Sequence, residues 1–350
     1  MRFKQIRLAA IAATSLAAAS FDVAADGRTN VAGKVFFDVA HRSDKRQAAV
    51  DSHASRTRVN LKRLYLELDQ RIDPVWSLKL VSDFQYAGDD GSTDAFVKKA
   101  YIEGRFGSKA VLRIGAADTP WLSALDKAQG FRYIERSLVD RLKFGHSADW
   151  GLHVSGRLGR VMPVDYGVSL VNGRGYKRSS RSQGVDIEAR IAVQPIENVV
   201  VALGAYTGKP NTERDGAPAV RSARRYNASI AYVGARTRVG GELFRSHAWN
   251  ELDEPIANRA QGWSLWASHG LAERLTVVAR LDRADTAEQT DPNAADRYAH
   301  AGLEYRWSDR FQLALVWKDT LREYSFSHDD QIQVGRRRGK EIGLWGQFVF

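Results

Sequence analysis

The sequence predicts an all-β fold, a transmembrane antiparallel β-barrel of about 16 strands. Three observations predict it: apolar and polar residues alternate, the connections are short and long in turn, and an alternating strand ends on the terminal Phe350. The 350 residues include no cysteine, so the fold must be held by burial and hydrogen bonding without disulfides. The mean hydropathy of −0.39 fits a barrel in which every second strand residue meets lipid.

Alternation with a period of two recurs along most of the chain. Around 185–193, for example, Val, Ile and Ala alternate with Asp, Glu and Arg. This period gives a strand one apolar face and one polar face, here a lipid face and a polar interior. Between Leu61 and Leu64 the apolar parity changes, which indicates a β-bulge or a later strand start. Further alternating stretches lie at 36–39, 76–86, 150–158, 199–205, 275–282, 311–317 and 342–350.

The connections between these stretches fall into two alternating classes. Seven are short, at 70–74, 106–109, 159–163, 194–198, 233–235, 270–273 and 308–310. Eight are long and polar, at 41–56, 88–94, 119–147, 173–183, 208–220, 249–260, 284–296 and 320–338. Short periplasmic turns, long external loops and an even strand number are typical of bacterial barrels. A soluble β-sandwich, the alternative, would not sort its connections in this way.

The N-terminal residues 1–25 have the composition of a signal peptide. Basic residues at the start precede an apolar stretch, Leu8–Ala19, and small residues precede Asp26. Those 12 residues are too few for a membrane-spanning anchor, which is the alternative. We therefore expect residues 1–25 to be a signal peptide, and residues 26–350 to form the barrel domain in the bacterial outer membrane. The aromatic Phe350 after its alternating strand resembles the signal read by the barrel-insertion machinery.

The longest connection, Thr119–Ser147, is unusually apolar for a surface loop. Ile134, Leu138 and Leu142 have the spacing of about two helical turns. An apolar segment needs a surface to pack on, and in a wide barrel that surface is the inner wall. We expect this third external loop to fold into the lumen and constrict it. The alternative is an external loop that carries its own small helix.

Several short motifs within residues 60–160 point to one family. Residues 133–140 (Tyr-Ile-Glu-Arg-Ser-Leu-Val-Asp), followed by Asp-Trp-Gly-Leu at 149–152, resemble the phosphate-selective porin O and P family. Upstream, 100–103, 112–115 and 119–121 are similar to the region of that family's fourth and fifth strands. The resemblance implies a sixteen-stranded, usually trimeric diffusion channel. It also implies that lumen arginines and loop lysines attract phosphate or pyrophosphate.

The predicted lumen carries more basic than acidic side chains. A basic ring in a narrow aqueous pore favours anions over cations, and guanidinium matches phosphate or carboxylate oxygens. Glu67, Glu103, Glu188, Asp282 and Glu304 share the interior parity, so structural pairing of some cations is the alternative. The residues expected to line the pore and bind anions are Arg63, Lys99, Arg113, Lys127, Arg132, Arg136, Arg141, Lys143, Arg157, Arg190, Arg238 and Arg280.

The function predicted from the sequence is therefore a porin for small anionic solutes, with phosphate or pyrophosphate as candidates and a homotrimer as the assembly. A general or carbohydrate-selective porin is the alternative, with Tyr101, Trp266 and Trp345 stacking on sugar rings. The 8 histidines are scattered and no Gly-x-Ser-x-Gly motif occurs, so neither an enzyme nor a metal or other cofactor is expected. A signal peptide and a barrel argue against a nucleic-acid partner.

Outer-membrane lipid and lipopolysaccharide are expected partners, because many basic residues fall in predicted external loops. They are Lys177, Arg178, Arg181, Arg221, Arg224, Arg225, Arg336, Arg337 and Arg338.

Overall fold

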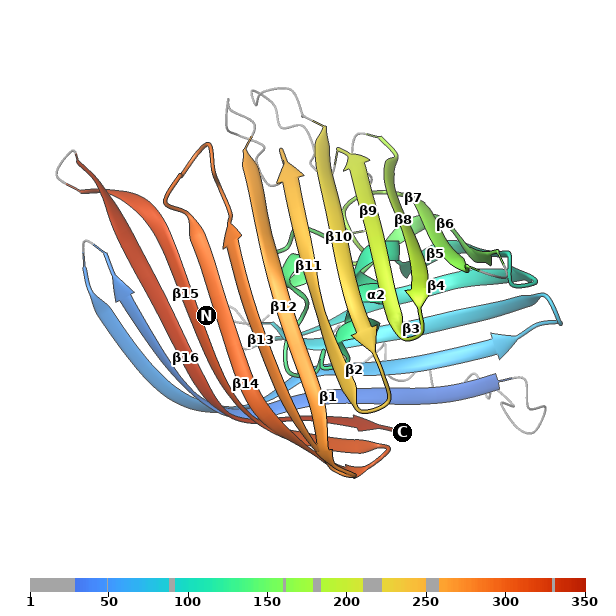
Figure 1. Cartoon of the computed structure of the whole chain (residues 1–350), viewed down its shortest axis with the longest axis horizontal. Helices are drawn as coiled ribbons and strands as arrows, with labels where there is room; N and C mark the ends of the chain where they lie inside the picture. The colour runs from blue at the N-terminus through green and yellow to red at the C-terminus, as the bar shows by residue number, and fades with distance from the viewer. Residues whose placement is uncertain are drawn as a thin grey trace, which may run out of the picture.

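The chain forms a closed barrel of 16 antiparallel strands, in which β1 also pairs with β16 (Figure 1). The predicted fold class and strand number are confirmed. The computed structural model describes residues 29–48, 50–87, 92–159, 162–178, 184–209, 222–249, 258–328 and 331–350. The predicted signal peptide, residues 1–25, lies outside the described residues.

The first eight strands are β1 (Thr29–Gln47), β2 (Ser52–Arg71), β3 (Trp76–Ala87), β4 (Ser92–Phe106), β5 (Ala110–Asp118), β6 (Ala148–Leu158), β7 (Val164–Val171) and β8 (Asp186–Ile196). The other eight are β9 (Val199–Gly208), β10 (Ala223–Val233), β11 (Thr237–His247), β12 (Arg259–Ala272), β13 (Leu275–Asp285), β14 (Ala295–Ser308), β15 (Phe311–His328) and β16 (Gln331–Val349). The helices are α2 (Pro120–Gln129) and α3 (Leu138–Arg141). Within the described residues, neither helix has the length and hydropathy needed to span a membrane.

All seven predicted short turns lie between strands where the sequence places them. The predicted long loops 41–56 and 320–338 are wrong in extent. The hairpins β1–β2 and β15–β16 continue through most of both ranges, with paired residues up to Arg46↔Ser52 and His328↔Gln331. The β1–β2 ends are largely polar on both faces, so the alternation that reveals a strand is absent there although the backbone pairing continues. In the β15–β16 hairpin, Tyr324, Phe326, Ile332 and Val334 do alternate with polar residues, so that extension was readable in the sequence.

A β-bulge interrupts the β1–β2 pairing at the point where the sequence parity changes. Phe36 pairs with Arg63 and Phe37 pairs with Leu61, which leaves Lys62 as the extra residue. Lys62 and Arg63 consequently line the same interior cavity although they are adjacent in sequence. The bulge prediction is confirmed, and it adds one cation to the lumen.

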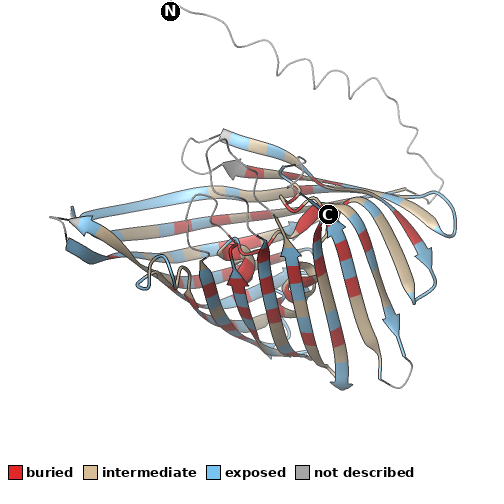
Figure 2. Ribbon diagram, turned by 90° about the horizontal axis from the view of Figure 1, so that it is seen from above, coloured by how far each residue is buried: buried red, intermediate tan, exposed pale blue. Residues whose placement is uncertain are grey.

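The third loop lies inside the barrel, as predicted, where its buried segments are enclosed by the ring of strands (Figure 2). Trp121, Leu122 and Val139 pack against small residues of the β8–β13 wall, including Ala202. On the other side of the lumen, Tyr133 and Ile134 pack against the walls formed by β1–β3 and β13–β16. The loop thus crosses the lumen and is fixed on both sides by burial of apolar surface.

The helices of the loop differ from the expectation. A helix through 134–142 is wrong in extent, because only Leu138–Arg141 is helical. The longer α2, which the apolar spacing did not reveal, begins with Pro120 at its first turn and ends before Gly130, whose φ is 85°. Proline at a helix start and glycine in the left-handed region after its end are standard boundary signals.

Candidate functional site

Two large interior cavities lie beside the third loop, one toward each end of the barrel. The loop-side cavity, about 740 Å³, is lined by β1–β4, β15, β16, residues 132–143 of the third loop, and Lys177. The turn-side cavity, about 900 Å³, is lined by β1–β8, the β2–β3 turn and the start of α2. No described residue lines both cavities. The third loop therefore separates two vestibules, the arrangement expected of a constriction.

The loop-side cavity is strongly basic. Its lining includes ten Lys or Arg residues: Arg42, Arg56, Arg58, Lys62, Arg63, Arg132, Arg136, Lys143, Lys177 and Lys318. Only four carboxylates line it: Asp38, Asp94, Glu135 and Glu341. Because cations outnumber carboxylates by this margin, their mutual pairing cannot neutralise the cavity.

Part of this positive charge is held in ion pairs. Arg42 donates to Glu341 at 3.0 Å, and Lys318 lies 3.1 Å from Glu135. Arg63 pairs with the buried Asp83. Such pairs contribute little net field at a distance, because each carboxylate cancels its cation.

Five cations of the loop-side cavity form no ion pair with any other described residue. They are Arg56, Arg58, Arg136, Lys143 and Lys177, and the ammonium of Lys177 lies 4.7 Å from the ring centre of Phe96. Arg56 and Arg58 come from the wall strand β2, whereas Arg136 and Lys143 come from the third loop. Unpaired cations from wall and loop therefore line the same space, where a permeating solute would meet both.

The tip of the third loop is held by two lysines from the barrel wall. Lys62 donates to the backbone oxygens of Tyr133 and Ile134 at 3.3 and 3.2 Å. Lys318 donates to the Ile134 oxygen at 2.7 Å, and its ammonium lies 4.4 Å from the ring centre of Trp345. These contacts fix the edge of the constriction, so Lys62 and Lys318 act as anchors as well as cavity cations.

The pKa of the Glu135 carboxyl beside this tip is held well below its usual range. Burial acts in the opposite direction, but the positive charges of Lys318, Lys62 and Arg136 outweigh it. Glu135 therefore stays ionised and keeps its pair with Lys318.

Behind the loop, Arg141 and Arg280 form a buried ionic network with the barrel wall. Arg141 lies 2.6 Å from Asp296 and 3.1 Å from Asp282. Arg280 lies 2.7 Å from Asp282 and donates to the Arg136 oxygen at 2.5 Å. The side chains of Arg141 and Arg280 are 6% and 3% exposed, so both brace the loop against the wall.

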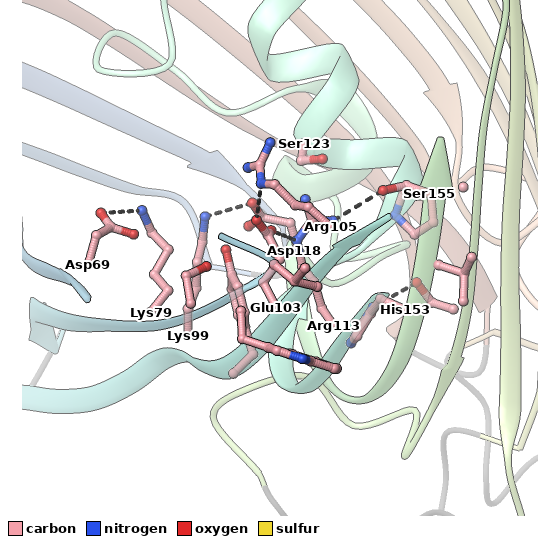
Figure 3. Close-up of a pocket in the computed structure, with 18 of the residues that line it drawn as sticks. Asp69, Lys79, Lys99, Glu103, Arg105, Arg113, Asp118, Ser123, His153 and Ser155 are labelled. Carbon is pink, nitrogen blue, oxygen red and sulfur yellow. Dashed lines mark hydrogen bonds and ion pairs between the residues drawn. The ribbon is translucent and has the colours of Figure 1, made fainter. Parts of the chain in front are cut away.

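The turn-side cavity is basic to a lesser degree, with seven Lys or Arg residues and four carboxylates in its lining (Figure 3). Lys99 pairs with Asp118 at 2.6 Å, and Arg113 pairs with Glu103 at 2.7 Å. Lys127 also lines this cavity, without an ion pair to another described residue. The same holds for Arg190, which completes the predicted site residues on this side.

Three predicted site residues remain. Arg132 bridges Asp126 and Asp140 within the loop, at 3.2 and 2.8 Å, at the edge of the loop-side cavity. Arg238 donates to the Lys127 oxygen at 2.8 Å and so caps the C-terminal end of α2. Arg157 lines neither large cavity and pairs with Asp165 at 2.6 Å in an exposed position.

Sequence reasoning missed several cavity cations. Arg42 and Arg56 fall in the range 41–56 assigned to a loop, Arg58 lies just after that range, and Lys62 was hidden by the bulge. The alternation of Arg56, Arg58 and Asn60 with residues of the other face was a usable signal, although no apolar partner marked it. Lys318 has the same parity as the interior-facing Val316, so the alternation of β15 could also have identified it as a lumen residue.

The assignment of Arg224, Arg225 and Arg336–Arg338 to external loops is wrong. Arg224 and Arg225 lie in β10, and Arg336–Arg338 lie in β16. Arg225 is 1% exposed and donates to Glu188 at 2.9 Å inside the barrel. Pairing of polar strand ends again explains the error. Arg181 and Arg221 lie outside the described residues.

Comparison with solved structures identifies the type of barrel. An anion-selective porin from Comamonas acidovorans aligns with 92% of this chain and 99% of its own, at a TM-score of 0.63 and 15% identity. The outer membrane channel DcaP of Acinetobacter baumannii aligns with 92% of this chain and 97% of its own, at a TM-score of 0.64 and 12% identity. The chain has the fold of bacterial outer-membrane porins.

OmpF of Salmonella typhi, solved in complex with daunomycin, has the same porin fold. It aligns with 92% of this chain and 97% of its own, at a TM-score of 0.59 and 10% identity. No family model matches the chain, and no curated protein does. The likeness to solved structures therefore establishes the porin fold, and the solute has to be argued from the cavities.

Proposed function

We propose that the chain is a bacterial outer-membrane porin that forms a water-filled diffusion channel for small anionic solutes. The observation that carries this proposal is the loop-side cavity, in which unpaired cations of the wall and the third loop line the same space. A cube of 740 Å³ has an edge of about 9 Å, close to the Debye length of about 8 Å at physiological salt. Every unpaired cation of the lining therefore acts on an ion inside the cavity.

Single-channel recording in a KCl gradient tests the anion preference. The expected zero-current potential has the sign of preferential chloride permeation. A potential of the opposite sign would refute the proposal. The third loop and the lumen cations together set the selectivity, so both contribute to this measurement.

Phosphate or pyrophosphate is the solute that we propose. Arg56, Arg58 and Arg136 offer planar forks that match phosphate oxygens, and the motif around residues 133–140 resembles the phosphate-selective family. The expected result is that added phosphate blocks chloride current whereas maltose leaves it unchanged. Equal chloride current with and without phosphate would leave an anion channel without phosphate preference.

The carbohydrate-selective alternative is less well supported by the aromatic residues. Trp266 packs against Leu125 of α2, and Trp345 lies beneath the loop tip, with 6% and 1% exposure. Neither ring is available for stacking on a sugar. Tyr101 lines the turn-side cavity, but Arg113 lies over its ring at 5.8 Å.

Delivery and assembly form the second part of the proposal. It comprises export with a cleaved signal peptide, recognition of Phe350 by the insertion machinery, and a homotrimer in the outer membrane; the sequence motifs and the porin fold support it. Native mass spectrometry of the detergent-extracted protein tests the assembly. Three mature chains per particle are expected, and a particle of one chain would contradict the trimer.

A further inference from the structure

A groove of about 510 Å³ lies on the outer surface of the barrel, over β9–β13. It is separate from the lumen, because the exposed side chains that line it project from the outward face of the strands. Leu203, Tyr226 and Leu243 are 58%, 57% and 60% exposed. Their chain neighbours Ala202, Arg225 and Phe244 are buried on the inward face. The groove therefore faces the surroundings of the barrel.

The groove exists because a small residue stands between large ones. Ala228 pairs with Leu203 on one side and with Leu243 on the other. Its methyl group leaves a hollow between the two leucine side chains, and Trp263, paired with Leu243, extends the apolar wall. The width of one residue between apolar walls suits an extended acyl chain.

One end of the groove is polar and cationic. Arg245, Gln261 and Asp285 follow one another across β11, β12 and β13 in register, and Arg283 pairs with Trp263. Both Arg245 and Arg283 are exposed and line the groove. Neither forms an ion pair with another described residue. Two forked donors are therefore free at the end of an apolar groove.

The cationic end lies toward the long loops. Arg245 is two residues from the end of β11 at His247, and Arg283 is two residues from the end of β13 at Asp285. A charge on the lipid face is tolerated near the membrane interface and costs about 2–4 kcal/mol at the bilayer midplane. The lining residues occupy two neighbouring rows across β9–β13, and the row that contains Tyr226, Arg245 and Asp285 is the one nearer the loops. The groove therefore lies across the strands, with its polar row nearer the membrane interface.

We infer that this groove binds a phosphorylated glycolipid of the outer leaflet, the lipid A part of lipopolysaccharide. Arg245 and Arg283 bind its phosphate, and an acyl chain lies between Leu203 and Leu243. Gln261 and Asp285 supply acceptors for the sugar hydroxyls of the headgroup. The inference rests on the outer-membrane location in the proposed function, but not on the permeating solute.

The experiment uses the purified full-length protein in detergent, titrated by native mass spectrometry with bisphosphorylated lipid A and with its dephosphorylated form. The expected result is about tenfold weaker binding of the dephosphorylated lipid, from the loss of charge-assisted hydrogen bonds. R245Q/R283Q should lower affinity for bisphosphorylated lipid A by about tenfold or more and leave the dephosphorylated lipid unaffected. The matched control R274Q/R310Q changes two exposed arginines at the turn side and should bind as the unmodified protein.

A second variant tests the apolar part. Ala228→Trp fills the hollow and should weaken both lipids. Unchanged lipid A binding in both R245Q/R283Q and Ala228→Trp would overturn the inference. Complete displacement of lipid A by inorganic phosphate at a concentration equal to that of the lipid would also overturn it, because a site for free anions needs no acyl chain. A change of oligomeric state in R245Q/R283Q with unchanged lipid binding would make the groove a contact between copies of this chain, and would also overturn it.

Failure of this inference and failure of the proposed function are distinguishable. Arg245 and Arg283 point away from the lumen, so R245Q/R283Q should keep the zero-current potential of the unmodified channel. A barrel that prefers anions but binds lipid A independently of phosphate refutes only the groove. A barrel with phosphate-dependent lipid binding and cation preference refutes only the anion channel.

Discussion

At the scale of single residues, the predicted pore-lining cations divide by what they contact. Arg141 and Arg280 are buried in pairs with Asp282 and so hold the third loop. Arg136 and Lys143 belong to the same loop, but no described carboxylate pairs with them. Sequence parity identifies which side of the strand a cation occupies. It does not show whether a carboxylate from a distant strand neutralises that cation.

The unpaired cations should control selectivity. In bulk water one unit charge changes the energy of an ion 9 Å away by about 0.5 kcal/mol, with opposite sign for anions and cations. With screening over one Debye length, R58Q/R136Q should lower the anion-to-cation permeability ratio by about threefold. The zero-current potential measures this ratio. Arg310→Gln at a short turn is the control, and an equal ratio in both variants would contradict the assignment.

The bracing arginines should control stability. Arg141→Leu leaves Asp296 and Asp282 buried with fewer partners, and breaking a buried ion pair costs about 3–5 kcal/mol. The unfolding midpoint in urea, followed in lipid vesicles, should fall markedly. Arg157→Leu, which removes an exposed pair, should change the free energy of unfolding by about 1 kcal/mol or less. Equal destabilisation by both variants would argue against the bracing role.

At the scale of elements, the third loop is a folded unit attached to the wall at several points. Thr119 donates to the His146 oxygen at 2.5 Å and closes the base. Arg238 caps α2, and Lys62 and Lys318 hold the tip. These attachments come from strands distributed around the ring, so the position of the constriction depends on the whole barrel.

Releasing the tip should widen the channel. K62M/K318M removes the donors to the oxygens of Tyr133 and Ile134, while methionine keeps most of the apolar stem. Larger single-channel conductance with more frequent current fluctuations is expected in planar bilayers. Lys340→Met, an exposed change on β16, is the control. A conductance equal to that of the control would mean that apolar burial alone fixes the tip.

The packing of α2 on the barrel wall requires a glycine at position 204, which has no side chain. A Cβ atom at Gly204 would lie 2.6 Å from the Trp121 ring, closer than atoms can approach. Gly204→Val should therefore displace α2 and lower the urea midpoint. Gly107→Val, at a turn position with no atom within 4 Å, provides a steric comparison, although its φ of 70° adds local strain. If Gly204→Val had the urea midpoint and the conductance of the unmodified protein, α2 could shift without a loss of stability.

The inward position of the third loop was predictable, because its apolar content exceeds what a surface loop can expose. The location of its longer helix was also within reach through Pro120 and Gly130, but apolar spacing alone favoured the wrong segment. The contacts of Lys62 and Lys318 with the tip were not predictable. They join residues more than 70 positions apart, and only closure of the barrel brings these together.

At the scale of the whole molecule, the alternating connections predicted the number of strands and the positions of the short turns. They did not predict how long the individual strands are. The strands β1, β2 and β16 contain 19 or 20 residues, but β7 contains only 8. At about 3.4 Å per residue, this corresponds to about 68 Å against about 27 Å of strand. The polar extensions of β1 and β2 carry almost no apolar signal, which is why the sequence pattern underestimates their part of the tall wall.

The tall wall has a kinetic consequence. Its inner face carries the unpaired Arg56 and Arg58 in the lining of the loop-side cavity, so a dissolved anion is attracted as it enters from the loop side. Capture of a blocking anion from the loop side should therefore slow steeply as ionic strength rises, while its escape rate changes little. Access from the turn side should show a weaker dependence. A raised basic wall on the loop side would thus speed the entry of dilute anions from that side, whereas the passive fluxes in the two directions remain equal at equal concentrations.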